Sequence, residues 1–167
     1  MKKILYLECK TGAAGDMLMG ALYSLLTEEQ KVLFLEKLNA ISEEVCVIPQ
    51  EICKQGIGGI HMKVEINGTE EGVEAHHHHE HNHHSHTSVA AILEQISKLD
   101  MSDAVKRDAE GIYRNIAAAE SKVHQTDMEQ IHFHEVGSVD ALIDVVGSCL
   151  ALELLGVDEV QASPVCV

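Results

Sequence analysis

The spacing of the apolar residues constrains the fold of this chain most. Some segments have the two-residue repeat of a strand, and others have the repeat of three to four residues of a helix. In residues 60–66, apolar and polar side chains follow each other one by one, as in a strand with one wet face. In residues 14–25, apolar side chains recur three or four positions apart, which is the repeat of a helix that buries one stripe. Along the whole chain, these two repeats predict strands and helices in the order β-α-α-β-β-α-α-α-β. This order predicts an α+β fold with helices packed on a small mixed β-sheet.

Capping residues and turn residues set the expected boundaries of these elements. Thr27 followed by Gln30 forms a capping-box pattern, and Gly156 follows the last apolar residue of the last helix. We expect a buried strand over 4–9, helices over 14–25 and 27–38, a hairpin of strands 45–54 and 60–66, helices over 87–99, 102–123 and 138–155, and a strand over 159–162.

Length and composition favour a single domain. The chain has 167 residues, of which 46% are hydrophobic and 3% aromatic, so its core must consist mainly of aliphatic side chains and methionine. Residues 67–86 lack apolar periodicity and are expected to form an exposed, flexible loop. Val160 to Val167 enters a strand without a closing helix or a polar tail. We therefore expect residues 1–167 to be the N-terminal domain of a longer protein, interrupted by this loop.

The charge excludes two classes of partner. Lys and Arg number 12 against 27 Asp and Glu, which gives a net charge of −15 that repels nucleic acids and anionic membrane surfaces. The sequence has neither a secretory signal nor an uninterrupted apolar run of about 18 residues. Its five cysteines are odd in number and include no C-x-x-C pair, which is typical of reduced thiols. We expect a cytoplasmic protein.

A histidine-rich segment gives the strongest chemical signal. Eight of the eleven residues from 76 to 86 are histidines, and neutral imidazole binds Ni(II), Cu(II), Zn(II) and Co(II). Ligand type alone does not select nickel among these ions. The alternatives are an expression tag or a solvated linker, but a tag is disfavoured because the run is internal and interrupted by Glu, Asn and Ser. The candidate ligands are His76, His77, His78, His79, His81, His83, His84 and His86.

A second candidate site lies at residues 131–137. In an extended backbone, His132 and His134 project to the same side, and Glu135 follows directly. One interpretation of this pattern, which the spacing alone supports no better than its alternative, is a second metal site separate from the histidine-rich segment. The alternative is a pair of hydrogen-bonded histidines at the entrance of the next helix.

The helix expected over 138–155 is apolar on almost every side. Asp140, Asp144 and Ser148 are spaced i, i+4 and i+8, so they form one polar line along it. This line is either a narrow stripe that faces solvent or a set of groups that binds a metal or orients His132 or His134.

Residues 11–16 connect the first strand to the first helix. Gly12 and Gly15 fit neither a Walker A loop nor a G-x-G-x-x-G loop. This segment is either a tight turn or a place where backbone N–H groups at the helix start hold a phosphate or a carboxylate. Asp16 argues partly against a bound anion, because its carboxylate already complements the helix dipole.

Together these motifs resemble the LarC family, the nickel insertases of the nickel-pincer cofactor. The run from His132 to Asp140 is the most specific of the matching features. They are Gly12-x-x-Gly15-Asp16-Met17, the histidines from 76 to 86, Ala118-Ala119-Glu120-x-Lys122-Val123-His124, His132-Phe133-His134-Glu135-Val136-Gly137-x-x-Asp140, and Ser163-Pro164.

The resemblance implies an activity, its cofactors and its partners. The family inserts Ni(II) into pyridinium-3,5-bisthiocarboxylic acid mononucleotide, a metal chelatase reaction of the lyase class that consumes CTP with a divalent metal, and the product serves lactate racemase-type enzymes. This chain resembles the N-terminal portion, so the C-terminal portion is an implied partner beside the pincer nucleotide, and a homo-oligomer stays open. Glu8 to Thr11 stand where the family has a segment containing Asp, Phe and Ser. No role is therefore carried over to that turn, and no catalytic residue is assigned.

Two other functions compete with nickel insertion. The first is a nickel store or metallochaperone that binds the ion and passes it on without chemistry. The second is a structural module whose histidines are incidental. Acceleration of nickel incorporation, beyond simple metal supply, separates the enzyme from the store.

Overall fold

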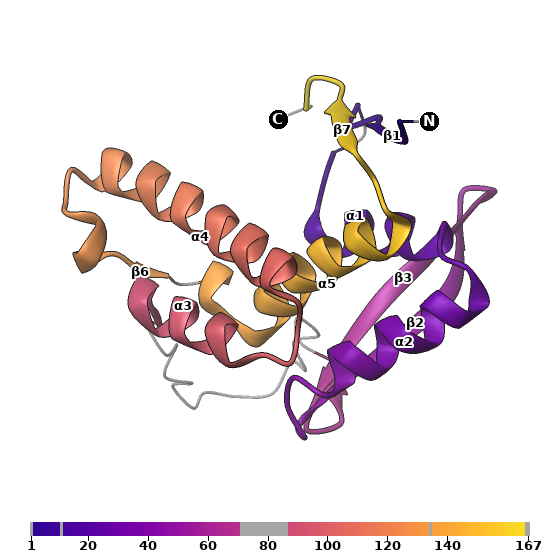
Figure 1. Cartoon of the computed structure of the whole chain (residues 1–167), viewed down its shortest axis with the longest axis horizontal. Coiled ribbons are helices and arrows are strands. Elements are labelled where there is room, and N and C mark those ends of the chain that lie inside the picture. Colours follow the sequence, from indigo (N-terminus) through magenta and orange to yellow (C-terminus); the bar gives the residue numbers. More distant parts are fainter. Residues whose placement is uncertain (1, 11, 71–86, 134, 166–167) are drawn as a thin grey trace.

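The computed structural model describes residues 2–10, 12–70, 87–133 and 135–165. The histidine-rich segment and His134 lie outside these residues. The α+β class that the sequence predicts is confirmed, with helices packed on a small sheet (Figure 1). The helices are α1 (Gly15–Ser24), α2 (Glu28–Asn39), α3 (Val89–Lys98), α4 (Asp103–His124) and α5 (Val139–Leu155), with the short 3-10 turns η1 (Met128–Gln130) and η2 (Glu135–Gly137). The strands are β1 (Ile4–Leu7), β2 (Val45–Lys54), β3 (Ile57–Ile66), β4 (Thr69–Glu70), β5 (Thr87–Ser88), β6 (His132–Phe133) and β7 (Glu159–Ala162).

The strands of the described ranges form three small sheets, whereas the sequence suggested a single mixed one. β2, β3 and β4 make an antiparallel sheet, β5 pairs with β6, and β1 pairs with β7 in parallel. Helices α1 and α2 pack on the β2–β3 hairpin. Apolar periodicity predicts where strands lie, but it carries no information on which strands pair, and for this reason the division into three sheets was not predicted.

The β2–β3 hairpin turns at Gln55 and Gly56. Both residues have positive φ angles, 54° and 82°, and Lys54 pairs with Ile57 across the turn. Such a two-residue turn matches the twist of the strands and lets β3 start at Ile57, three residues before the expected start. The hairpin buries the side chains of alternate residues on the face that meets the helices, which are Val45, Val47, Met62 and Val64.

Side-chain hydroxyl groups cap the starts of four helices, and the capping box predicted at Thr27 is confirmed. Thr27 and Gln30 form the capping box of α2, and Ser102 and Ser138 accept hydrogen bonds at the starts of α4 and α5. Helix α3 is capped by Ser88, because Thr87 and Ser88 pair as β5 before the helix begins.

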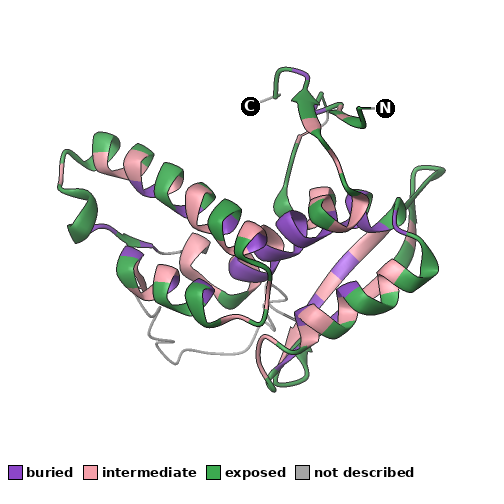
Figure 2. Ribbon diagram, viewed as in Figure 1, coloured by how far each residue is buried: buried purple, intermediate pink, exposed green. Residues whose placement is uncertain are grey.

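Helix α5 is the centre of the molecule, and α1, α2 and α4 pack around it (Figure 2). Two glycines let α1 lie very close to its neighbours. A Cβ on Gly147 of α5 would collide with the Met19 sulfur, and a Cβ on Gly20 of α1 would collide with the backbone oxygen of Ile60. Within the described part of the chain, no helix combines the length and the apolar character needed to cross a lipid bilayer.

Strand β1 is only partly buried, because its alternate residues are exposed, which corrects the expectation of a buried strand over residues 4–9. Ile4 is 52% exposed and Tyr6 59% exposed, and the β1–β7 pair stands apart from the helices (Figure 1). The apolar residues of β1 suggested burial, but burial depends on what packs against a strand. The residues that the structure describes cover only part of the apolar surface of β1.

Candidate functional site

The start of helix α1 is capped by a residue of helix α5. Ala14, the N-cap residue, provides no side-chain hydrogen bond. Instead, the backbone N–H of Asp16 donates a hydrogen bond to the Asp144 carboxylate. The close approach requires glycine at position 15, where a Cβ would lie 2.9 Å from both Cβ and Cγ of Asp144. Asp144 therefore complements the positive end of the α1 dipole from a different element.

The Asp144 carboxyl has a strongly shifted pKa. Burial, together with the smaller effect of the neighbouring carboxylates of Asp140 and Asp16, raises this pKa to about 7, whereas the hydrogen bond from the Asp16 N–H acts in the opposite direction. At neutral pH, Asp144 is therefore able both to hold and to release a proton. Shifts of this kind are typical of functional sites but also occur at structural ones.

Tyr113 of helix α4 is close enough to Asp144 for the charge of this carboxyl to act on its hydroxyl. It is completely buried, and burial together with the Asp144 charge raises the pKa of its hydroxyl. Its ring packs against Phe133 of β6, with 5.7 Å between the ring centroids. Among the described residues, neither the Tyr113 hydroxyl nor Asp144 Oδ1 has a hydrogen-bond partner. Tyr113 thus connects Asp144 with the strand that carries His132.

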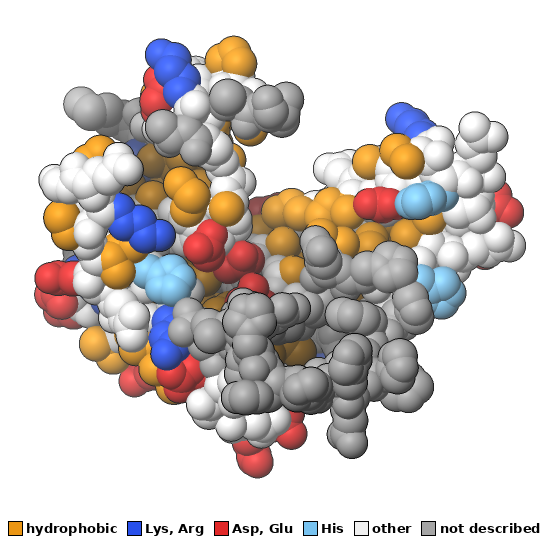
Figure 3. All heavy atoms as spheres, turned by 180° about the vertical axis from the view of Figure 1, so that it is seen from behind, with side chains coloured by type: hydrophobic (Ala, Val, Ile, Leu, Met, Phe, Trp, Pro, Cys, Tyr) orange, Lys and Arg blue, Asp and Glu red, His pale blue; other side chains and the backbone are white. Residues whose placement is uncertain are grey.

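His61 of strand β3 completes what we call the Asp144 cluster, which consists of Asp16, His61, Tyr113, Asp140 and Asp144. His61 Nε2 lies 4.0 Å from Asp16 Oδ2, and both side chains are half-buried. Figure 3 shows acidic side chains beside a histidine in the hollowed middle of one face. In the described ranges, no group of three or more His, Cys, Asp or Glu is arranged to hold a metal ion. The cluster is suited to proton exchange and to fastening α1 onto α5.

The structure decides between the two interpretations of the polar line on α5. A solvent-facing stripe is wrong, because Ser148 is only 8% exposed and Asp144 contacts the start of α1. The contacts of Asp144 are with α1 and α4, so its role as a metal ligand or as an orienting partner of His132 or His134 stays untested.

The segment from Gly12 to Asp16 combines both of its expected roles. Gly12 has a φ of 103° and its N–H donates to the Cys9 carbonyl, which makes a tight turn. The helix start also holds a carboxylate, but this carboxylate belongs to Asp144 of the same chain.

His61 and Tyr113 are members of the site that were not predicted from the sequence. The alternation along residues 60–66 places His61 on the wet face of the hairpin, but it does not reveal Asp16 as its neighbour. In the sequence, Tyr113 resembles any other apolar position of the helix expected over 102–123. No local signal in the sequence indicates either contact.

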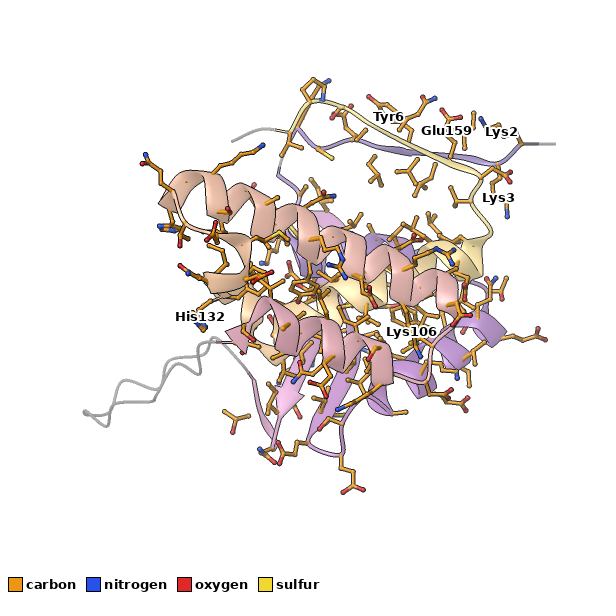
Figure 4. All side chains as sticks on the ribbon, turned by 60° about the vertical axis from the view of Figure 1, so that its left-hand side comes forward. Lys2, Lys3, Tyr6, Lys106, His132 and Glu159 are labelled. Atoms are coloured by element: carbon orange, nitrogen blue, oxygen red, sulfur yellow. The ribbon has the colours of Figure 1, made fainter. Side chains whose placement is uncertain are left out.

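His132 lies at the surface on the short β5–β6 sheet (Figure 4). It pairs with Ser88, while the next residue, Phe133, is buried, so the predicted alternation is present at these two positions. Strand β5 begins at Thr87, the residue that directly follows the histidine-rich segment in the sequence. Strand β5 therefore follows that segment directly in the sequence and pairs with the strand of His132. Metal binding by His132, His134 and the histidines from 76 to 86 stays a prediction.

Comparisons with known proteins give a consistent result. The family described as "Nickel insertion protein" matches residues 5–167. The chain is 39% identical over 167 residues to the pyridinium-3,5-bisthiocarboxylic acid mononucleotide nickel insertion protein of Lactiplantibacillus plantarum, covering 96% of this chain and 39% of that protein. It is 40% identical to the protein of the same name from Clostridium kluyveri, covering 98% of this chain and 40% of that protein.

A third relative of that name, from Geobacillus kaustophilus, is 36% identical and is covered over 38% of its length. The chain thus spans about 39% of the length of the curated relatives that it matches. No solved structure matches it.

Proposed function

Because this chain belongs to the nickel insertion protein family, we propose that it supplies the nickel-binding part of an enzyme that inserts Ni(II) into pyridinium-3,5-bisthiocarboxylic acid mononucleotide. The observation that carries the proposal is the family match over residues 5–167. The names of the relatives supply the substrate. Since the chain spans only part of the length of these relatives, the complete reaction is assigned to the longer protein and not to this chain alone.

Nickel is the cargo of this reaction, and the histidines from 76 to 86 are proposed to capture it. Eight imidazoles in eleven positions suffice for roughly two ions at about four to six ligands each. The absence of a three-ligand group among the described residues leaves this segment as the richest source of ligands in the chain.

His132 and His134 are proposed to receive nickel from that segment. The support for this step is the β5–β6 pairing, because β5 starts directly after His86 and pairs with the strand of His132. Nickel then passes from these histidines toward the thiocarboxylate sulfurs of the nucleotide.

The remaining parts of the proposal concern the complete enzyme. The chelatase reaction, of the lyase class, consumes CTP with a divalent metal, and we assign this step to the C-terminal portion, which the family resemblance implies as a partner of this chain. A homo-oligomer of the complete enzyme stays compatible with this arrangement. We place the protein in the cytoplasm, where free thiols such as those of Cys9, Cys46, Cys53 and Cys149 persist.

A nickel store or metallochaperone is the second candidate, and the density of imidazoles favours it as much as it favours the enzyme. The two are separated with a complete protein in which this chain replaces the matching stretch of the Clostridium kluyveri relative. This protein is incubated with Ni(II), the pincer nucleotide and CTP, and the product is detected by mass spectrometry. An insertase forms the nickel-containing nucleotide faster than free Ni(II) does. A store binds nickel but leaves that rate unchanged, which would contradict the proposal.

A further inference from the structure

The exposed β1–β7 pair is a built element with apolar side chains on both of its faces. Alternate residues of a strand share a face, so Ile4 and Tyr6 project to one side. Val160, which pairs with Leu5, projects to the other side. These three side chains are 52%, 59% and 45% exposed. Figure 4 shows Tyr6 and Glu159 on the pair, away from the helices.

Hydrogen bonds hold this pair in place at both ends. At one end, the Lys3 N–H donates to the Asp158 carboxylate over 2.6 Å, and the Asp158 N–H donates back to the Lys3 carbonyl over 2.9 Å. At the other end, the Cys9 N–H donates to the buried Ser163 hydroxyl over 2.8 Å. The apolar side chains are therefore presented in a fixed geometry.

A parallel pair of this kind is incomplete as a sheet. Parallel sheets are normally covered on both faces, and a two-stranded unit is marginally stable in water. β1 and β7 pair over only four residues each. In the part of the chain that the structure describes, no further strand pairs with the outer edges of β1 and β7, and proteins normally pair or cover such edges.

We propose that the β1–β7 pair is an interaction surface on which the remaining polypeptide of the complete protein adds strands and covers Ile4, Tyr6 and Val160. The length of the relatives supports this occupant, because the chain spans about 39% of it. A second copy is disfavoured, because each chain carries a net charge of −15 and two copies repel each other. The proposal rests on the proposed function only in treating this chain as one part of a longer protein.

The test compares two proteins in the absence of nickel and nucleotides. One is this chain alone, and the other is the complete protein with this chain in place of the matching stretch of the Clostridium kluyveri relative. Hydrogen exchange is measured at residues 4–7 and 159–162 in both proteins. We expect the amides of these residues to exchange at least about tenfold more slowly in the complete protein.

A substitution gives an independent readout. Tyr6→Lys should leave the Tm of the chain alone unchanged, because Tyr6 is already exposed there, but it should lower the Tm of the complete protein and restore fast exchange in β1. Ile57→Lys is the matched control, since Ile57 is 76% exposed at the tip of the β2–β3 hairpin, and it should be neutral in both proteins.

Three outcomes would overturn the proposal. The first is equal exchange of β1 and β7 in the two proteins, and the second is a neutral Tyr6→Lys in the complete protein. The third is protection of the chain alone that rises with its concentration, which identifies a second copy as the occupant. If the complete protein fails to insert nickel in a separate assay, but none of these three outcomes is seen, the proposed function is contradicted and the surface proposal stands.

Discussion

The Asp144 carboxyl should make the stability of this protein depend on pH in a predictable direction. Its pKa is raised from 3.8 to about 7 in the folded chain. Between these two values, the folded state holds a proton that the unfolded state has lost. The stabilisation that Asp144 contributes is therefore complete below about pH 3.8 and is lost as the pH rises through about 7.

The size of this effect follows from the two pKa values. Their difference corresponds to about 4 kcal/mol at ~1.4 kcal/mol per pH unit. Because Asp144 is only partly buried, solvent screening reduces this figure, and we expect about 2 kcal/mol. Asp144→Asn removes the charge but keeps an oxygen that accepts the hydrogen bond from Asp16. This variant should therefore exceed the stability of the original chain by about 2 kcal/mol near pH 8 and by less than about 1 kcal/mol near pH 5, where only a smaller part of the Asp144 stabilisation has been lost.

The assay is urea denaturation of both proteins at about pH 5 and about pH 8. Ionisable groups that both proteins share cancel in the comparison of the two differences. Asp108→Asn is the control, because it removes an exposed carboxyl of α4 and should give the same stability difference at both pH values. If Asp144→Asn also gives the same difference at both pH values, the account of the Asp144 cluster is wrong.

Three further predictions concern packing and metal binding. Gly20→Ala should lower the free energy of unfolding by about 1–3 kcal/mol, because the added Cβ collides with the Ile60 backbone. Gly111→Ala, at an open helix position, is the control and should raise the free energy of unfolding by about 0.5–1 kcal/mol. Thermal denaturation measures both effects. Deleting residues 76–86 should remove most of the bound nickel, measured by elemental analysis, with little change in Tm, and a large loss of helicity on deletion would contradict this expectation. Nickel binding by the intact chain should weaken below about pH 6.5, because imidazole must be neutral to bind the ion. Replacing His132 and His134 by Gln should abolish nickel insertion by the complete protein without unfolding it, and survival of insertion would make both histidines structural.

The sequence predicts the local structure well, because the forces that set it act over a few residues. The Thr27 capping box and the Gly156 C-cap were both visible in short motifs. The alternation in residues 60–66 likewise identifies β3. Each of these signals reflects a hydrogen bond or a side-chain direction fixed by neighbours in the chain.

The Asp144 cluster could not be predicted in the same way, because its members come from four elements. Gly15 marks the place where α1 approaches α5, but the sequence does not say which residue fills the space. The spacing of Asp140 and Asp144 identifies a polar line, and only the packing of α1 shows that Asp144 faces a helix start and not solvent. The exposure of β1 is a similar case, since apolar residues indicate a need for covering but not its source.

The central claim, that the histidines of this chain deliver nickel for insertion, is tested most directly by the rate of insertion at limiting nickel. The complete protein is compared with a variant in which every histidine from 76 to 86 is replaced by Asn, with the pincer nucleotide and CTP in excess. We expect the variant to form the nickel-containing nucleotide at least about tenfold more slowly when nickel is scarce and to regain most of the rate when nickel is abundant. Equal rates at limiting nickel would contradict the account.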